Sequence, residues 1–191
     1  MLDLSLIMDY LKNNISSKRY LHSVNVSNTA VQLAEAYGSD VNKARVAGLV
    51  HDCARELNKD FLLNCLAAEG IAADELTLGL KELLHGPAAV HICRGVFGIV
   101  DEEILGAVRY HTTGRENMSL LEKIIYLADC IEPSRSFDGV EKLRGLAFEN
   151  LDEALLMALN SSIQYIMARD GLIHVDTVLS RNYVLKELQK I

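Results

Sequence analysis

Helix start and stop signals recur along this chain, whereas signals for β-strands are almost absent. Only two prolines occur among 191 residues, and no Asn-Gly or Asp-Gly turn joins two β-branched runs. Cap-type residues, breaks at glycine and apolar residues at helical spacing instead predict helices over 16–38, 40–57, 59–70, 85–98, 101–111 and 119–133. A longer helical region runs from about 139 to 169 with a break near Asn150, and a last helix runs from about Asp176 to the end. We therefore expect an all-α, single-domain helical bundle of about nine or ten helices over residues 1–191.

Charge and residue distribution disfavour several classes of protein. A net charge of −7 argues against a surface for nucleic acid or an anionic membrane. Apolar runs are short and interrupted by charges, and "MLDLSLIMDY" at the start carries two acids but no basic residue, unlike a secretory signal. We expect a cytoplasmic protein with a small-molecule partner, no nucleic acid and no membrane. The cysteines form no CxxC pair, which disfavours a structural zinc site: Cys53, Cys65, Cys93 and Cys130.

The segment "VAGLVHDCAREL" (46–57) places a histidine and an aspartate side by side in an otherwise apolar predicted helix. Burying charge is costly unless the group is paired or binds a metal, so His51 and Asp52 are candidate metal ligands. Neighbours on a helix point about 100° apart, so a shared ion must lie beside the helix and take further ligands from other helices. His22 in "RYLHSVNV" and Asp129 in "YLADCIEP" are the candidates, although each alone is also compatible with a structural role.

The order of these motifs resembles a known family. His22, then His51-Asp52, then Asp129 is similar to the signature of the HD-domain metal-dependent phosphohydrolases. Six segments from Arg19 to about Asn182 resemble, in order, the motifs of the YqeK family, the symmetrical bis(5'-nucleosyl)-tetraphosphatases: "RYLHSVNV", "GLVHDCAREL", "ELLHGPAA", "RYHTTGR", "LADCIEPSRSFDGV" and "DGLIHVDTVLSRN". The resemblance implies an HD-type bundle that cleaves diadenosine tetraphosphate into two ADP by means of a metal-activated water.

The resemblance also implies roles for individual residues. It predicts a divalent transition metal, with iron favoured and manganese as the alternative, as one or two ions held by His22, His51, Asp52 and Asp129. Catalysis is then expected from Asp52, which would orient the attacking water, and from His85 and His111, which would contact phosphates or protonate the leaving group. The resemblance implies substrate contacts for a wider set of residues: Arg19, His22, Asp52, Arg55, His85, His111, Thr112, Asp129, Arg135, Leu172, Ile173, His174 and Thr177. Within this set the arginines suit phosphate, and the four residues from Leu172 to Thr177 are expected to form the wall of the nucleoside pocket.

Alternative functions share part of this pattern. An HD phosphatase acting on nucleoside monophosphates or other phosphomonoesters would use the same metal chemistry, because one fold hosts many substrates. A non-catalytic nucleotide-binding regulator would require a broken ligand set, and all four ligand residues are present. The family commonly has Pro-Gly where this chain has Asp138-Gly139, which adds a negative charge near the proposed phosphate site. The apolar face of "LDEALLMALNSSIQYIM" (151–167) predicts packing in the core or against a second copy, and we favour a homodimer.

Overall fold

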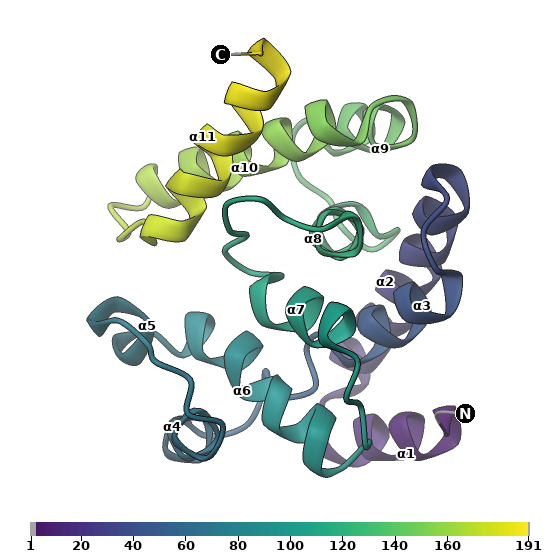
Figure 1. Ribbon diagram of the computed structural model, residues 1–191, viewed down its shortest axis with the longest axis vertical. Coiled ribbons are helices and arrows are strands. Elements are labelled where there is room, and N and C mark those ends of the chain that lie inside the picture. The colour runs from purple at the N-terminus through teal and green to yellow at the C-terminus, as the bar shows by residue number, and fades with distance from the viewer. Residues whose placement is uncertain (1–2, 191) are drawn as a thin grey trace.

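Residues 3–190 are described by a computed structural model, and within them the chain forms eleven helices and no strand (Figure 1). This confirms the all-α prediction. The helices are α1 (Leu4–Asn14), α2 (Ser17–Tyr37), α3 (Val41–Val50), α4 (Lys59–Ala68), α5 (Glu75–Gly79), α6 (Lys81–Gly95), α7 (Glu102–Tyr110), α8 (Leu120–Ile131), α9 (Val140–Glu149), α10 (Leu151–Met167) and α11 (Val175–Gln189).

Helix α8 lies at the centre of the bundle, with α9 and α10 above it in the view, α7 below and α2 and α3 to one side (Figure 1). Apolar side chains surround this helix on nearly every face, which is the pattern of a fully buried helix. Those that are buried include Leu121, Ile124, Ile125, Leu127, Ala128 and Ile131. The central position of α8 brings any polar residue near its end against residues of both α2 and α3.

The helix boundaries follow the capping signals of the sequence. The Asp40 carboxylate accepts hydrogen bonds from the backbone of Asn42 and Lys43 and so starts α3. Ser119 and Glu122 form the predicted capping box at the start of α8. Asn150, as expected, separates α9 from α10 by capping the second of them.

The prediction that His51 and Asp52 lie within a helix is wrong. Helix α3 ends at Val50, His51 is its C-cap, and residues 51–56 form turns. The chain tightens here through backbone hydrogen bonds from Cys53 to Val50 and from Arg55 to Asp52, each spanning three residues. His51 and Asp52 therefore point into the bundle from a turn, and Arg55 belongs to that turn instead of lying one helical turn further on.

The start of α6 also differs from the prediction. The helix begins at Lys81, four residues before the expected start at His85, so Pro87 lies inside the helix. Helices α1 and α5 lie outside the predicted helical ranges, and with them the described residues contain eleven helices where nine or ten were predicted. Gly86 allows α6 to approach α7 closely, because a Cβ at this position would lie 2.8 Å from the Arg109 carbonyl oxygen. This close approach places His85 beside the end of α7.

The apolar face of α10 packs within the chain. Its buried residues are Leu151, Ala154, Leu155, Ala158 and Leu159. The core therefore accounts for this face, and the homodimer stays a prediction. Across residues 3–190, no helix combines the length and the apolar character that crossing a membrane requires.

Candidate active site

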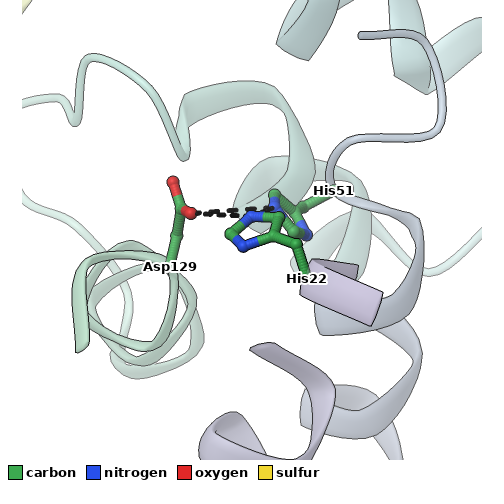
Figure 2. A group of neighbouring side chains, drawn as sticks. All are labelled: His22, His51 and Asp129. Carbon is green, nitrogen blue, oxygen red and sulfur yellow. Dashed lines mark hydrogen bonds and ion pairs between the residues drawn. The ribbon is translucent and has the colours of Figure 1, made fainter. Parts of the chain in front are cut away.

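Three side chains from separate elements converge beside α8 (Figure 2). His22 comes from α2, His51 from the end of α3, and Asp129 from the last turn of α8. The His22 Nε2 atom lies 3.0 Å from Asp129 Oδ1 and 3.3 Å from His51 Nε2. The structure thus brings together three of the four predicted metal ligands, with His22 and His51 buried and Asp129 half-buried.

The fourth predicted ligand, Asp52, lies between two groups of histidines. Its Oδ2 atom is 3.6 Å from His22 Nε2 and 3.5 Å from His51 Nε2. Its Oδ1 atom faces the other way, 3.0 Å from His85 Nε2 and 3.6 Å from His111 Nε2. Asp52 therefore links the proposed metal ligands to the two histidines predicted to act in catalysis.

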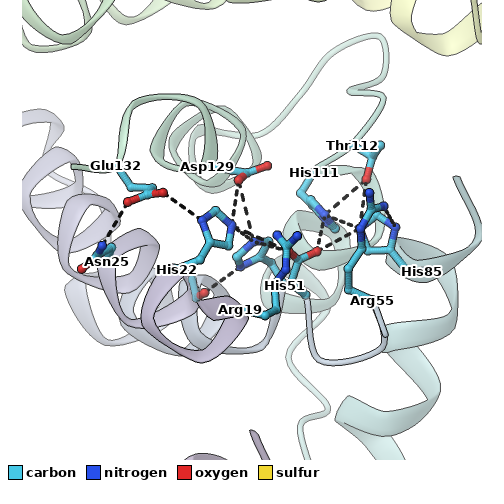
Figure 3. A network of polar contacts seen from close by, with 12 residues as sticks. Arg19, His22, Asn25, His51, Arg55, His85, His111, Thr112, Asp129 and Glu132 are labelled. Atoms are coloured by element: carbon cyan, nitrogen blue, oxygen red, sulfur yellow. Dashed lines mark hydrogen bonds and ion pairs between the residues drawn. The ribbon is translucent and has the colours of Figure 1, made fainter. Parts of the chain in front are cut away.

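The hydrogen bonds of the second ring nitrogens determine how the ligand histidines face one another. His51 Nδ1 lies 2.8 Å from the Gly48 carbonyl oxygen and His22 Nδ1 lies 3.0 Å from the Glu132 carboxylate, and both partners only accept hydrogen bonds. Each Nδ1 must therefore carry its proton, so both neutral rings present an Nε2 lone pair to the shared space. Figure 3 shows the contact between His22 and Glu132 on the left side of the cluster.

This donor set fits a divalent transition metal. Two Nε2 atoms and a carboxylate oxygen of Asp129 lie within 4.8 Å of one another. While both rings are neutral these three atoms are all acceptors, so they repel each other unless a metal cation or a proton lies between them. Imidazole with carboxylate is a ligand set that iron, manganese and zinc accept. A second group of potential ligands consists of His51, Asp52 and His111, and it shares His51 with the first.

The electrostatics of the cluster favour positive charge at the same point. Burial lowers the pKa of His22, but hydrogen bonds to Asp129 and Glu132 outweigh it and leave the pKa raised. Burial also tends to raise the pKa values of Asp52 and Asp129. The neighbouring His51 outweighs this effect at Asp52 and holds its pKa well below the ordinary range. At Asp129, the hydrogen bond to His22 and the charge of Arg135 do the same. Both carboxylates are therefore ionised at neutral pH and attract a cation.

His85 has the opposite tautomer from the ligand histidines. Its Nδ1 lies 3.0 Å from an Arg55 guanidinium nitrogen, which can only donate, so the proton of neutral His85 is on Nε2. That atom faces Asp52. It also lies 2.9 Å from His111 Nε2 (Figure 3). Burial lowers the pKa of His85 to about 4, so at neutral pH the ring is an uncharged hydrogen-bond donor. Thr112 Oγ1 lies 3.2 Å from His111 Nε2 and completes this side of the cluster.

Two of the three predicted phosphate-binding arginines pair with carboxylates of the site itself. Arg19 on α2 lies 2.7 Å from Asp52 Oδ2, and Arg135 in the loop after α8 pairs with Asp129. Together with Arg55 they border a pocket of about 200 Å³. Its lining is Arg19, Asp52, Arg55, His85, His111, Thr112, Tyr126, Asp129, Cys130, Arg135 and Ser162. Asp138, in contrast, is exposed and does not line this pocket.

The last four predicted substrate residues lie elsewhere, around the connection between α10 and α11. Leu172 and Ile173 line an apolar groove of about 660 Å³ together with residues of α5. His174 caps α11, and its Nε2 atom lies 3.0 Å from Thr77 Oγ1 and 3.1 Å from Asp74 Oδ2. Thr177 is buried in the first turn of α11. This groove and the pocket beside the histidine cluster share no lining residue and are thus separate parts of the surface.

Several residues of the site were not predicted. Glu132 is fully buried and contacts His22, and its position three residues after Asp129 in an apolar helix was a usable signal. Tyr126, Cys130 and Ser162 line the central pocket because α10 packs against α8, a contact that no local pattern encodes. In the apolar groove beside Leu172, the lining residues from α5 likewise depend on packing between distant segments.

The chain is similar to several known proteins. The HD domain family model matches residues 19–134. The symmetrical bis(5'-nucleosyl)-tetraphosphatase of Bacillus subtilis (strain 168) is 39% identical over 92% of this chain and 94% of that protein. The protein of the same name from Halalkalibacterium halodurans is 40% identical over 94% of this chain and 96% of that protein.

A solved structure shows the same architecture. It is described as a predicted HD superfamily hydrolase involved in NAD metabolism from Clostridium acetobutylicum. The two chains are 46% identical and superpose with a TM-score of 0.94, covering 98% of this chain and 99% of the other. The whole described bundle, and not only the segment around the histidines, therefore has a counterpart in a protein of known structure.

Proposed function

Because the chain belongs to the HD-domain family, we propose that it is a metal-dependent hydrolase that cleaves diadenosine tetraphosphate symmetrically into two ADP. The observation that carries this proposal is the convergence of His22, His51 and Asp129 around one point, next to three arginines. Two relatives that match nearly end to end bear the name of this activity. The chain's own partner is then a dinucleoside polyphosphate or the product ADP.

We propose that the metal is one iron ion held by His22, His51, Asp52 and Asp129, with manganese as the alternative. When bound, a divalent metal supplies positive charge at the phosphate and lowers the pKa of a water molecule towards neutrality. A single ion is favoured because the second possible group shares its His51 atom with the first. The Nε2 proton of His85 further disfavours a second ion on that side of Asp52.

The remaining side chains bind and orient the tetraphosphate. Arg19, Arg55 and Arg135 are planar donors at the pocket rim that neutralise phosphate oxygens. The Thr112 hydroxyl donates a hydrogen bond to the phosphate under attack or to the departing one. The His85 Nε2–H group does the same when it exchanges its contact with Asp52 Oδ1 for one with the substrate. ADP leaves as a stable phosphate anion, so an uncharged His85 that donates a hydrogen bond is sufficient, and a full proton transfer is not required.

We assign nucleoside binding to the groove between α5 and the α10–α11 connection. Leu172, Ile173 and Val175 provide one wall, and Leu76 and Leu80 provide the other. A flat purine ring gains most from such an apolar surface, while its sugar and phosphates extend towards charged residues. His174 ties the two walls together through its contacts with Thr77 and Asp74.

Product analysis tests the proposed activity. Purified protein loaded with iron or with manganese is incubated with diadenosine tetraphosphate, and the nucleotides are separated by chromatography. ADP as the only product is expected. ATP with AMP would contradict symmetric cleavage while retaining the metal chemistry. Release of phosphate from AMP in place of tetraphosphate cleavage would favour the phosphomonoesterase alternative, and tight nucleotide binding without turnover would favour a regulator.

Leu172→Asn tests the nucleoside groove separately. Leu172 is 70% exposed, so its replacement leaves the core intact but removes apolar surface from the groove. A loss of about 1 kcal/mol of binding free energy is expected, which corresponds to a roughly fivefold higher KM with little change in kcat. Val100→Asn is the matched control, because Val100 is 79% exposed in the loop before α7. Equal KM values for both variants and the unmodified protein would place the nucleoside elsewhere.

A further inference from the structure

Glu132 is a buried carboxylate at the end of α8, and only its contact with His22 has been used so far. Its side chain is fully buried, yet every contact it makes is with a hydrogen-bond donor. Oε1 lies 3.0 Å from His22 Nδ1, and Oε2 accepts hydrogen bonds from Asn25 Nδ2 at 3.1 Å and from the Ser134 backbone at 2.7 Å. The Ser134 hydroxyl donates to Oε1 as well. A buried charge with this many donors is held in one position.

The contact with His22 fixes the ring of a proposed metal ligand. Because Nδ1–H donates to a carboxylate, the ring cannot flip without losing a charge-assisted hydrogen bond, and Nε2 stays directed at His51 and Asp129 (Figure 3). A carboxylate behind a histidine ligand also makes the ring a stronger donor to a metal. Asn25, one turn after His22 on α2, holds the other oxygen of Glu132 and so limits its movement.

The opposite side of Glu132 holds the loop that carries Arg135. Ser134 immediately precedes Arg135, and both its backbone and its hydroxyl donate to the carboxylate. Arg144 of α9 fixes the same loop from outside, through hydrogen bonds to the carbonyl oxygens of Ile131 at 2.8 Å, Glu132 at 3.0 Å and Arg135 at 2.8 Å. One carboxylate therefore contacts both a metal ligand and the phosphate-binding loop.

We propose that Glu132 is a positioning residue that orients His22 for the metal and, through Ser134, sets the position of Arg135 for the phosphates. The proposal rests on the metal-dependent function proposed above and deepens it. Glu132 is not a metal ligand in this proposal, because its Oε1 atom is bonded to His22 Nδ1 on the side of the ring away from the metal. The proposal nevertheless predicts that removing the charge of Glu132 weakens metal binding by His22. Loosening Ser134 instead is predicted to affect the phosphates more than the metal.

Metal titration of Glu132→Gln is the decisive experiment. The amide has nearly the same shape, but its NH₂ group must face a donor, because all partners of the carboxylate donate. We expect the Kd for Mn²⁺, measured by competition with a chelator, to rise by about 10- to 100-fold while circular dichroism shows a folded protein. Glu69→Gln is the matched control, since Glu69 Oε1 lies 2.8 Å from His91 Nδ1 in a similar pair outside the site. Its Kd for Mn²⁺ is expected to stay unchanged.

Ser134→Ala separates the two halves of the proposal. It leaves the contact between Glu132 and His22 in place, so the Kd for Mn²⁺ should be retained while KM for diadenosine tetraphosphate rises. If Glu132→Gln does not fold, Asn25→Ala takes its place, with a smaller rise in the Kd for Mn²⁺ expected. An unchanged Kd in the folded Glu132 variant, or in its Asn25 substitute, would overturn the proposal. Failure of the unmodified protein to hydrolyse the tetraphosphate would reject only the proposed function, because the metal titration does not depend on turnover.

Discussion

Asp52→Asn is expected to lower the rate of diadenosine tetraphosphate hydrolysis by about 10³-fold or more. The substitution keeps the size of the side chain but removes the negative charge that faces His22, His51, His85 and Arg19 at once. It also replaces one carboxylate oxygen by an amide nitrogen, which cannot coordinate a metal and is a poor partner for the Nε2–H group of His85. We therefore expect weaker metal binding and poorer orientation of the substrate in the same variant.

Three measurements distinguish the reasons for this loss. Metal content after purification, the Kd for Mn²⁺ and the single-turnover rate are compared with those of Asp152→Asn, a partly exposed aspartate that pairs with Lys123 at 2.6 Å. Loss of metal together with activity would identify Asp52 as a ligand. Retained metal with lost activity would instead assign Asp52 to orienting the water or the phosphates. Full activity in the Asp52 variant would remove this residue from the mechanism.

The sequence predicted those parts of the fold that depend on neighbouring residues. The capping box of Ser119 and Glu122 and the break at Asn150 are encoded within a few positions, and the structure contains both. The order of His22, His51 and Asp129 predicted a common site, and the structure brings these three side chains together. Local patterns and the order of motifs were therefore sufficient to predict most of the helices and the convergence of His22, His51 and Asp129.

Other features depend on contacts that the apolar pattern does not reveal, either between a side chain and the nearby backbone or between distant segments. Helix α3 ends at Val50 where the chain tightens into turns and the His51 ring bonds back to the Gly48 carbonyl, although the apolar pattern continues past this point. The position of Glu132 three residues after Asp129 was a usable signal for the residue, but its contacts with His22 and Asn25 require the approach of α2 to the end of α8. Prediction from the sequence therefore failed where a side chain contacts the backbone or an element far along the chain.

Gly48→Ala is expected to weaken both the fold and the metal site. A Cβ at this position would lie 2.6 Å from the Ser27 Cα atom and 2.9 Å from the Ser27 backbone nitrogen, so α2 and α3 must separate to accept it. Overpacking of this kind lowers the free energy of unfolding by about 1–3 kcal/mol, or several degrees in Tm for a chain of this size. Because His22 lies on α2 and His51 follows α3, the same separation pulls the two Nε2 atoms apart from their 3.3 Å spacing.

Thermal unfolding and Mn²⁺ titration of the Gly48 variant check both effects. Gly145→Ala is the control, because Gly145 lies on α9 with no heavy atom within 4 Å of the added Cβ. There the alanine should stabilise the protein by roughly 0.5–1 kcal/mol, since it restricts the unfolded chain and favours the helix. A Gly48 variant with unchanged Tm would mean that the helices shift without strain. A lower Tm with an unchanged Kd for Mn²⁺ would show that the ligands keep their geometry independently of helix packing. That result would contradict the expectation that the contact between α2 and α3 sets the distance between His22 and His51.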